Sequence, residues 1–249
     1  MAETLPIIAR DWALFLDVDG TLLDFASRPD AAIVPPPLRQ TLTALSGALG
    51  GALAIISGRT IADLDRLFAP LRLPVAGQHG AEARRGERIC IFAPGSPALA
   101  SVLAPVYALG EQRPAIMIEN KGLSAAIHYA EAGSERDALS ELLPKAIARS
   151  DGAFRLLASH LAFDIVPQAI DKGRAVDWFM ADAPFAGRVP VFIGDERTDE
   201  DGFAAAMARG GHAINVGPRR GSIAPWHMPT PQDLRAWLDR SLATLEQSR

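Results

Sequence analysis

Two carboxylates spaced two residues apart follow an apolar run near the start of the chain. The run, Trp12–Leu16, has the length and composition of a short buried strand. Asp17 and Asp19 come directly after it, and Gly20 and Thr21 then turn the chain. If the segment stays extended, alternation puts both carboxylates on one side, where their charges repel. A hard divalent cation with oxygen ligands, such as Mg²⁺, would relieve that repulsion. The alternative for so short a motif is an acidic loop that caps a helix.

Three further groups of polar residues come at the ends of predicted strands or the starts of predicted helices. Ser57–Arg59 offers a hydroxyl and backbone amides that suit a phosphate oxygen, although Ser57 or Thr60 could simply cap the following helix. Lys172 opens another helix, and near Asp17 it would neutralise negative charge. The stretch Asp195–Asp201 is strongly acidic, which would also suit a solvated helix start.

The segments around these groups alternate between strand and helix patterns. Such alternation predicts a parallel sheet with helices on both faces. The carboxyl ends of parallel strands lie at one edge of a sheet, so the polar groups are expected to converge there. We expect a loop over 217–228. The expected strands are 12–16, 52–56, 188–193 and 212–216, and the expected helices are 38–49, one from residue 60, one from 172 and one from 230.

The pattern changes between about residues 93 and 166, where we predict a separate α/β domain inserted into the first. The predicted limits are 94–166 for this domain and 1–93 with 167–249 for the core. Pro105 and Pro144 are expected to kink or break its helices. Inside it we expect helices over 98–109 and 134–149 and strands over 115–119, 123–129, 154–157 and 161–166.

Composition bounds the class of protein. Apolar residues make up 49% of the 249 residues, which is enough for a substantial core and excludes a disordered chain. The formal net charge of −4 argues against a partner that is a nucleic acid or a membrane surface. The first ten residues do not resemble a signal peptide, and no apolar run reaches transmembrane length. We therefore expect a cytoplasmic protein.

The ordered motifs resemble those of the haloacid dehalogenase (HAD) superfamily of phosphatases. The string D-x-D-G-T-L at Asp17–Leu22 resembles the first motif, Ser57–Arg59 the second and Asp171–Gly173 the third. Gly194–Phe203 reads G-D-x-x-T-D-E-D-x-F, which is similar to the fourth motif of trehalose-6-phosphate phosphatases, with Glu196 in place of a second Asp. A Gly-x-His-Gly-Ala-Glu stretch at 77–82 carries the same resemblance, which covers nearly the whole chain.

The resemblance implies a Rossmann-like HAD core with an inserted α/β cap that recognises the sugar. In such enzymes the first Asp, here Asp17, accepts the phosphoryl group. The second, Asp19, is the general acid and base and lends a backbone carbonyl to Mg²⁺, while Lys172 holds the phosphate and Asp17. The implied substrate-binding residues are Ser57, Gly58, Arg59, His79, Glu119, Lys121 and Asp164, and the implied metal site comprises Asp17, Asp19, Asp195 and Asp199.

The implied activity is Mg²⁺-dependent hydrolysis of trehalose 6-phosphate, with a pathway link to the synthase that makes it. The identity of the sugar stays open, because four positions depart from the family pattern: Ala130, Ser159, His160 and Val166. A HAD phosphatase for another sugar phosphate, of the sucrose or glucosylglycerol type, is the first alternative. A phosphate-binding protein without turnover is the second.

Overall fold

The computed structural model describes residues 5–26, 31–93, 97–129, 134–159 and 161–247. The chain divides into two compact units, Met1–Cys90 with Asp171–Arg249, and Ile91–Ile170. Each unit has its own hydrophobic core and its own sheet. The predicted limits of 94 and 166 for the inserted domain stay a prediction, as does its role. Within the described residues, none of the helices is long and apolar enough to cross a membrane.

The first unit is built on an eight-stranded sheet in the order β12-β11-β10-β1-β2-β3-β4-β5. The strands from β12 to β3 run parallel, and β4 returns antiparallel to β3. Its strands are β1 (Trp12–Leu16), β2 (Leu53–Ile56), β3 (Val75–Gly77), β4 (Glu82–Arg85), β5 (Arg88–Ile91), β10 (Val189–Gly194), β11 (His212–Val216) and β12 (Trp226–Met228). Its helices are α1 (Pro36–Ala48), α2 (Ile61–Phe68), α5 (Lys172–Met180), α6 (Glu200–Ala208) and α7 (Pro231–Gln247).

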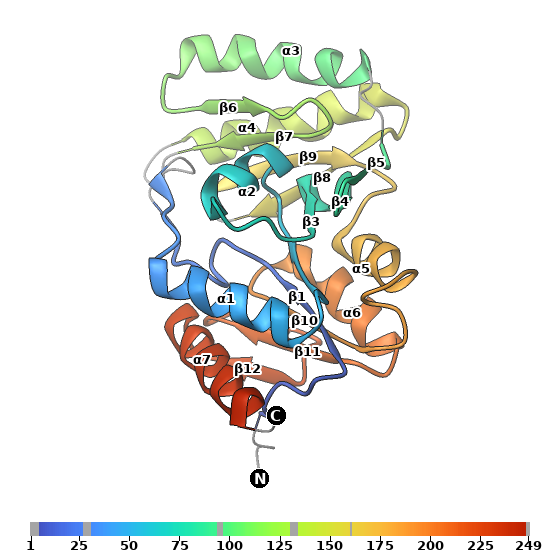
Figure 1. Ribbon diagram of the computed structural model, residues 1–249. Coiled ribbons are helices and arrows are strands. Elements are labelled where there is room, and N and C mark those ends of the chain that lie inside the picture. Colours follow the sequence, from blue (N-terminus) through green and yellow to red (C-terminus); the bar gives the residue numbers. More distant parts are fainter. Residues whose placement is uncertain (1–4, 27–30, 94–96, 130–133, 160, 248–249) are drawn as a thin grey trace. The chain divides into compact units, whose positions relative to one another are not determined.

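The order of the parallel strands creates a switch point between β1 and β10. From β1 the chain crosses through α1 to β2 on one side, and from β10 it crosses through α6 to β11 on the other. Right-handed crossovers in opposite directions put the two helices on opposite faces of the sheet. Figure 1 shows α1 beside α7 on one face and α5 beside α6 on the other. Ligands of such sheets bind outside the carboxyl ends of the strands at the switch point.

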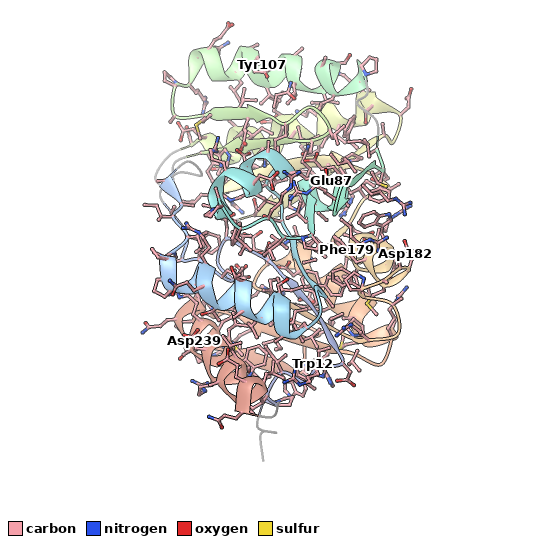
Figure 2. The ribbon with its side chains drawn as sticks, viewed as in Figure 1. Trp12, Glu87, Tyr107, Phe179, Asp182 and Asp239 are labelled. Carbon is pink, nitrogen blue, oxygen red and sulfur yellow. The ribbon has the colours of Figure 1, made fainter. Side chains whose placement is uncertain are left out.

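Aromatic residues fill the interior between the sheet and α5. Phe15 of β1 contacts Phe179 and Phe185, with ring centroids 5.9 Å and 5.5 Å away, and all three side chains are fully buried. Figure 2 labels Phe179 within this interior. Burying a large apolar side chain stabilises the fold by about 1.5–3 kcal/mol relative to leaving it exposed. This packing fixes β1 and α5, the elements that carry Asp17 and Lys172.

The second unit is a four-stranded antiparallel sheet with two helices on one face. The strand order is β6-β7-β9-β8. Alternate strand residues such as Ile118, Ile127 and Ile165 pack with both helices in its core, so the residues between them lie on the opposite face. Its elements are α3 (Pro97–Gln112), β6 (Met117–Asn120), β7 (Ala125–His128), α4 (Glu135–Ile147), β8 (Phe154–Ser159) and β9 (Ala162–Pro167).

The structure differs from two expectations about secondary structure. Neither proline breaks its helix, because α3 and α4 continue through Pro105 and Pro144, while a kink at either one stays a prediction. Buried residues on both sides of Pro105, such as Leu103 and Val106, hold α3 against the sheet despite the hydrogen bond that proline removes. The segment expected to be all loop ends in β12, which pairs with β11.

Candidate active site

Asp17 and Asp195 follow neighbouring parallel strands at the switch point. In the register, Leu16 of β1 lies opposite Ile193 of β10. The ladder extends one residue further, because the amide of Asp17 donates to the carbonyl oxygen of Ile193 at 3.0 Å. Both carboxylates are buried, 5% and 9% exposed. The predicted meeting of positions 17 and 195 at one edge of the sheet is therefore present in the structure.

Lys172 links Asp17 to a second acidic residue. Lys172 begins α5, and the side chain of Asp171 caps that helix by accepting from the amide of Arg174. The Lys172 Nζ donates to Asp17 Oδ1 at 2.8 Å and to Asp199 Oδ1 at 2.7 Å, and the lysine is 2% exposed. Burial lowers the pKa of Lys172, but the charges of Asp17 and Asp199 outweigh that effect and raise it. Lys172 is thus a permanent cation in contact with Asp17.

Asp199 holds the loop after β10 in place. It is fully buried at the end of a 3₁₀ helix, Arg197–Asp199. Its Oδ2 accepts from the amides of Asp195 and Glu196, both at 2.9 Å, while its Oδ1 accepts from Lys172. Because both of its oxygens are engaged, Asp199 fixes the position of the Asp195 backbone.

Thr21 and Gly20 fit closely against the carboxylate of Asp195. The Thr21 hydroxyl donates to Asp195 Oδ1 at 2.8 Å and lies 3.3 Å from Asp17 Oδ2. Gly20 has φ +81°, and a Cβ built there would lie 2.2 Å from Asp195 Oδ2. A glycine is required at this position both for its backbone angle and for the close approach.

Three carboxylates meet here, and one lysine cannot neutralise them all. One oxygen each from Asp17, Asp195 and Asp199 lies within 4.8 Å of the others. Burial, together with the charge of Asp199 and despite that of Lys172, raises the pKa of Asp17 to about 6. Burial and the charges of Asp17 and Asp199 raise the pKa of Asp195 to about 9. Among the described residues no ion pair involves Asp195, so its carboxyl is the one that needs a cation.

This donor set fits a divalent metal ion. Carboxylate oxygens are the ligands that hard cations such as Mg²⁺ prefer, and a dication would balance the charge that now favours protonated Asp195. The predicted cluster of acidic metal-site side chains is therefore compatible with the structure at positions 17, 195 and 199.

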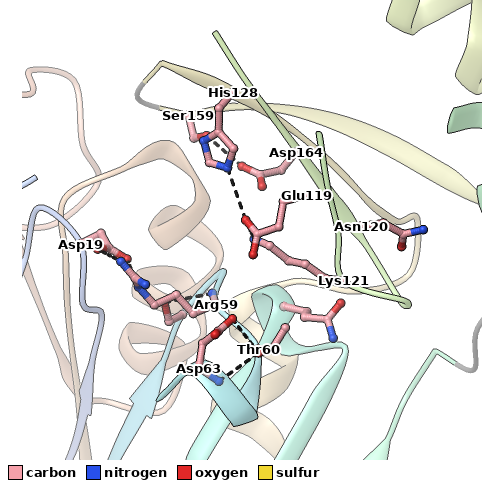
Figure 3. A network of polar contacts seen from close by, with 12 residues as sticks. Asp19, Arg59, Thr60, Asp63, Glu119, Asn120, Lys121, His128, Ser159 and Asp164 are labelled. Carbon is pink, nitrogen blue, oxygen red and sulfur yellow. Dashed lines mark hydrogen bonds and ion pairs between the residues drawn. The ribbon is translucent and has the colours of Figure 1, made fainter. Parts of the chain in front are cut away.

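Asp19 points its carboxylate at Arg59. The guanidinium donates from Nε to Asp19 Oδ2 and from Nη2 to Asp19 Oδ1, each at 2.7 Å (Figure 3). Arg59 belongs to the Ser57–Arg59 turn after β2, and Thr60 then caps α2 by accepting from the amide of Asp63. Of the residues predicted to bind substrate, Arg59 is thus in direct contact with the predicted acid and base.

Ser57, Gly58 and His79 form a tight pair of turns after β2 and β3. Ser57 is 2% exposed, and its hydroxyl accepts from the amide of Arg59 at 3.3 Å. The amide of His79 donates to the Ser57 carbonyl at 3.0 Å. A Cβ at Gly58 would lie 2.7 Å from His79 Nε2, so the imidazole packs directly on this turn.

In the second unit, polar side chains lie on the sheet face opposite the helices. The register aligns Glu119, Ala126 and Asp164 across β6, β7 and β9. Lys121 Nζ is 3.7 Å and His128 Nε2 is 3.3 Å from Glu119 Oε2, as Figure 3 shows. The hydrogen bond with His128 is the main reason that the pKa of Glu119 is lowered. The predicted residues Glu119, Lys121 and Asp164 therefore share one polar face.

The side chains at the divergent positions are only partly described. Ser159 donates to Asp164 Oδ2 at 2.8 Å, so this serine orients a predicted substrate-binding carboxylate. Val166 is fully buried. Ala130 and His160 lie outside the described residues.

Thr21 and Arg219 contact Asp195 without having been predicted. Thr21 stands within the D-x-D-G-T-L string, so the motif itself was the available signal. Arg219 donates from Nε to the carbonyl oxygen of Asp195 at 2.8 Å and from Nη2 to Asn215 and Glu200. No pattern in the sequence connects Arg219 with Asp195, because their contact depends on how the loop after β11 folds back.

Comparison with known proteins agrees with this geometry. The model of the trehalose-phosphatase family matches residues 15–230. The trehalose-6-phosphate phosphatase of Escherichia coli K12 is 36% identical over 251 residues, covering 100% of this chain and 93% of that protein.

Two solved structures share the fold. The C-terminal domain of trehalose-6-phosphate phosphatase from C. albicans has a TM-score of 0.84 at 20% identity, covering 93% of this chain and 92% of that one. A phosphatase of the HAD superfamily from Bacteroides thetaiotaomicron has a TM-score of 0.63 at 17% identity, covering 99% of each chain. The predicted α/β fold, with a parallel sheet and helices on both faces, is confirmed.

Proposed function

Because the chain belongs to the trehalose-phosphatase family, we propose that it hydrolyses trehalose 6-phosphate to trehalose and phosphate. The observation that carries the proposal is the contact of Lys172 with Asp17 beside Asp195 and Asp199. These residues come from three distant segments of the sequence and meet at the switch point of the sheet. With a divalent cation to balance the remaining carboxylate charge, this group would suit an anionic, phosphorylated substrate.

Asp17 is the nucleophile. With a pKa raised to about 6, it is mostly a carboxylate at neutral pH. Its Oδ1 is held by Lys172, which orients the carboxylate and reduces its repulsion from an incoming phosphate. An Asp17 oxygen attacks phosphorus as the bond from phosphorus to the sugar oxygen breaks, which leaves an aspartyl phosphate.

Asp19 moves the protons of both half-reactions. It gives a proton to the leaving sugar oxygen and then takes one from the water that attacks the aspartyl phosphate. As water bonds to phosphorus, the bond to Asp17 breaks and its electron pair returns to that carboxylate. Asp19 is suited to this exchange because its side chain is 31% exposed, whereas that of Asp17 is buried.

Mg²⁺ is the proposed metal, which Asp17, Asp195 and the backbone carbonyl of Asp19 would hold, while Asp199 would orient its waters. When bound, it draws negative charge from the phosphoryl oxygens. The residues of this chain prepare that site: Asp199 anchors the loop of Asp195, and Thr21 orients the carboxylate of Asp195. The hydroxyl of Ser57 and the backbone of Gly58 complete the phosphate contacts, and His79 supports that turn.

The polar face of the second unit is the proposed sugar site. Glu119, Lys121 and Asp164 offer acceptors and donors that match a surface rich in hydroxyl groups. This role makes the second unit the cap of the enzyme. We place the enzyme in the cytoplasm, downstream of a synthase that forms the phosphorylated disaccharide.

Phosphate release with Mg²⁺ tests the proposal. Trehalose 6-phosphate, sucrose 6-phosphate, glucosylglycerol phosphate and glucose 6-phosphate are compared by kcat/KM, with Asp17→Asn as the inactive control. We expect trehalose 6-phosphate to exceed the others by about tenfold or more, because several buried hydrogen bonds to one sugar discriminate strongly. A different preferred sugar phosphate would overturn the substrate, and no release from any of them would overturn the activity.

A further inference from the structure

Arg59 and Asp19 form a two-pronged ion pair at the edge of the candidate active site. The two hydrogen bonds, each of 2.7 Å, join both carboxylate oxygens to two different guanidinium nitrogens. The side chain of Arg59 is 12% exposed and that of Asp19 is 31% exposed. Bidentate pairs of this kind fix the plane of the carboxylate as well as its position. Figure 3 shows the two groups facing each other.

The backbone of Arg59 is itself held firmly. Its amide donates to the Ser57 hydroxyl at 3.3 Å, and its carbonyl accepts from the amide of Gln78 at 2.8 Å. Thr60, the next residue, caps α2. A Cβ at Gly77 would lie 2.8 Å from the Arg59 carbonyl, so β3 packs closely against it. The guanidinium is therefore presented from a rigid turn.

We propose that Arg59 is a positioning residue that acts through Asp19, orienting the carboxylate that exchanges protons with the leaving group and with water. This inference rests on the proposed function, in which Asp19 is the acid and base. It changes the role expected for Arg59 from the sequence, which was direct contact with the substrate.

The hydrogen bonds are compatible with proton exchange at Asp19. A carboxylate has about four lone-pair sites, and the arginine fork occupies two of them. When Asp19 carries the proton for the sugar oxygen, one carboxyl oxygen still accepts from Arg59. After the proton leaves, both bonds form again and hold the carboxylate ready to take a proton from water. Without Arg59, the Asp19 side chain would rotate among several positions, and few of them would face the reacting oxygen.

A double-mutant cycle between Arg59 and Asp19 distinguishes this role from direct substrate binding. We expect Arg59→Gln to lower kcat by about 10- to 100-fold with KM within about threefold, as a misoriented acid would. Asp19→Asn should lower kcat by about 100- to 10,000-fold. The double variant should stay within about twofold of Asp19→Asn, because Arg59 has nothing left to orient. Losses that multiply, or a loss confined to KM, would overturn the proposal.

Burst kinetics give a readout that a general folding defect would not produce. p-Nitrophenolate leaves without a proton, so Arg59→Gln should release the first equivalent from p-nitrophenyl phosphate at close to the normal rate and then slow down. Asp19→Asn should behave in the same way. Equal slowing of both phases would overturn the proposal. Arg59→Lys keeps the charge but lacks the fork, so we expect it to recover only part of kcat and to provide the test if Arg59→Gln does not fold.

Arg66→Gln is the matched control. Arg66 lies on α2 close to Arg59 in sequence, is exposed and pairs with Asp63. Its substitution therefore removes the same positive charge without changing a contact of Asp19. Its kcat should equal that of the wild type. The cycle also separates the role proposed for Asp19 from the role proposed for Arg59. Full turnover by the single variant Asp19→Asn would contradict Asp19 as the acid and base, whatever the effect of substituting Arg59.

Discussion

The charge balance around Asp195 predicts that metal binding depends steeply on pH. Without metal, burial and the charges of Asp17 and Asp199 raise the pKa of Asp195 to about 9. A divalent ion binds the carboxylate form, so at pH 7.5 the ion must displace about one proton. The apparent affinity for the divalent ion at pH 7.5 should be about 30-fold below its value well above pH 9. It should fall about tenfold between pH 8 and pH 7. Below pH 6, Asp17 also takes up a proton and the fall steepens.

Isothermal titration calorimetry with Mg²⁺ measures this effect directly. Titrations at pH 7.5 in two buffers of different ionisation enthalpy count the protons released, and titrations from pH 6 to 9 give the slope of affinity. Asp195→Asn is the control, because it removes the titrating group. An affinity that is constant from pH 6 to 9, with no proton released, would refute the charge balance derived from the structure.

The same shift predicts how the metal-free protein responds to pH. A carboxyl group whose pKa is raised on folding adds stability below its ordinary pKa of about 4, and this stability is lost as pH rises toward 9. At pH 8 in EDTA, the wild type must take up almost one proton at Asp195 on folding, whereas an amide needs none, so Asp195→Asn should unfold at a higher temperature than the wild type. A lower melting temperature for this variant would contradict the reasoning.

Substitutions at three places in the structure test other parts of the account. Asp17→Asn should keep the fold, checked by circular dichroism, and lose nearly all phosphate release, whereas substantial remaining turnover would remove the nucleophile. Gly20→Ala and its control Gly217→Ala both force an alanine to φ +81°, which lowers the stability of each variant by about 1–2 kcal/mol. A Cβ at Gly20 would clash with the Asp195 carboxylate, whereas no described atom lies within 4 Å of a Cβ at Gly217. Only Gly20→Ala should therefore also lose Mg²⁺ affinity in calorimetry. Glu119→Ala or Lys121→Ala should lower kcat/KM for trehalose 6-phosphate far more than for p-nitrophenyl phosphate, and equal losses would indicate a misfolded cap.

The meeting of Asp17 and Asp195 was predictable because it follows from a general rule. Both come at the carboxyl end of an apolar strand, and parallel strands end at the same edge of a sheet. Lys172 required the family resemblance as well, since a lysine at a helix start is more often solvated. Its contacts with Asp17 and Asp199 come from the packing of α5 on the sheet, which the sequence pattern does not encode locally.

Contacts made by long side chains were not predictable. Arg59 was expected to face the substrate, and only the geometry of its turn reveals the pairing with Asp19. Arg219 reaches Asp195 from a loop 24 residues further along the chain. The strand β12 has three residues and follows a loop rich in glycine and proline, so its periodicity is too short to detect.

Capture of the covalent intermediate tests the central claim most directly. The enzyme is mixed with Mg²⁺ and trehalose 6-phosphate, quenched with acid within a single turnover and reduced with borohydride, which converts an aspartyl phosphate to homoserine. Mass spectrometry of the peptides then locates the change. The account predicts homoserine at position 17 in the wild type and its absence in Asp17→Asn. Phosphate release by the wild type without modification at position 17 would contradict it.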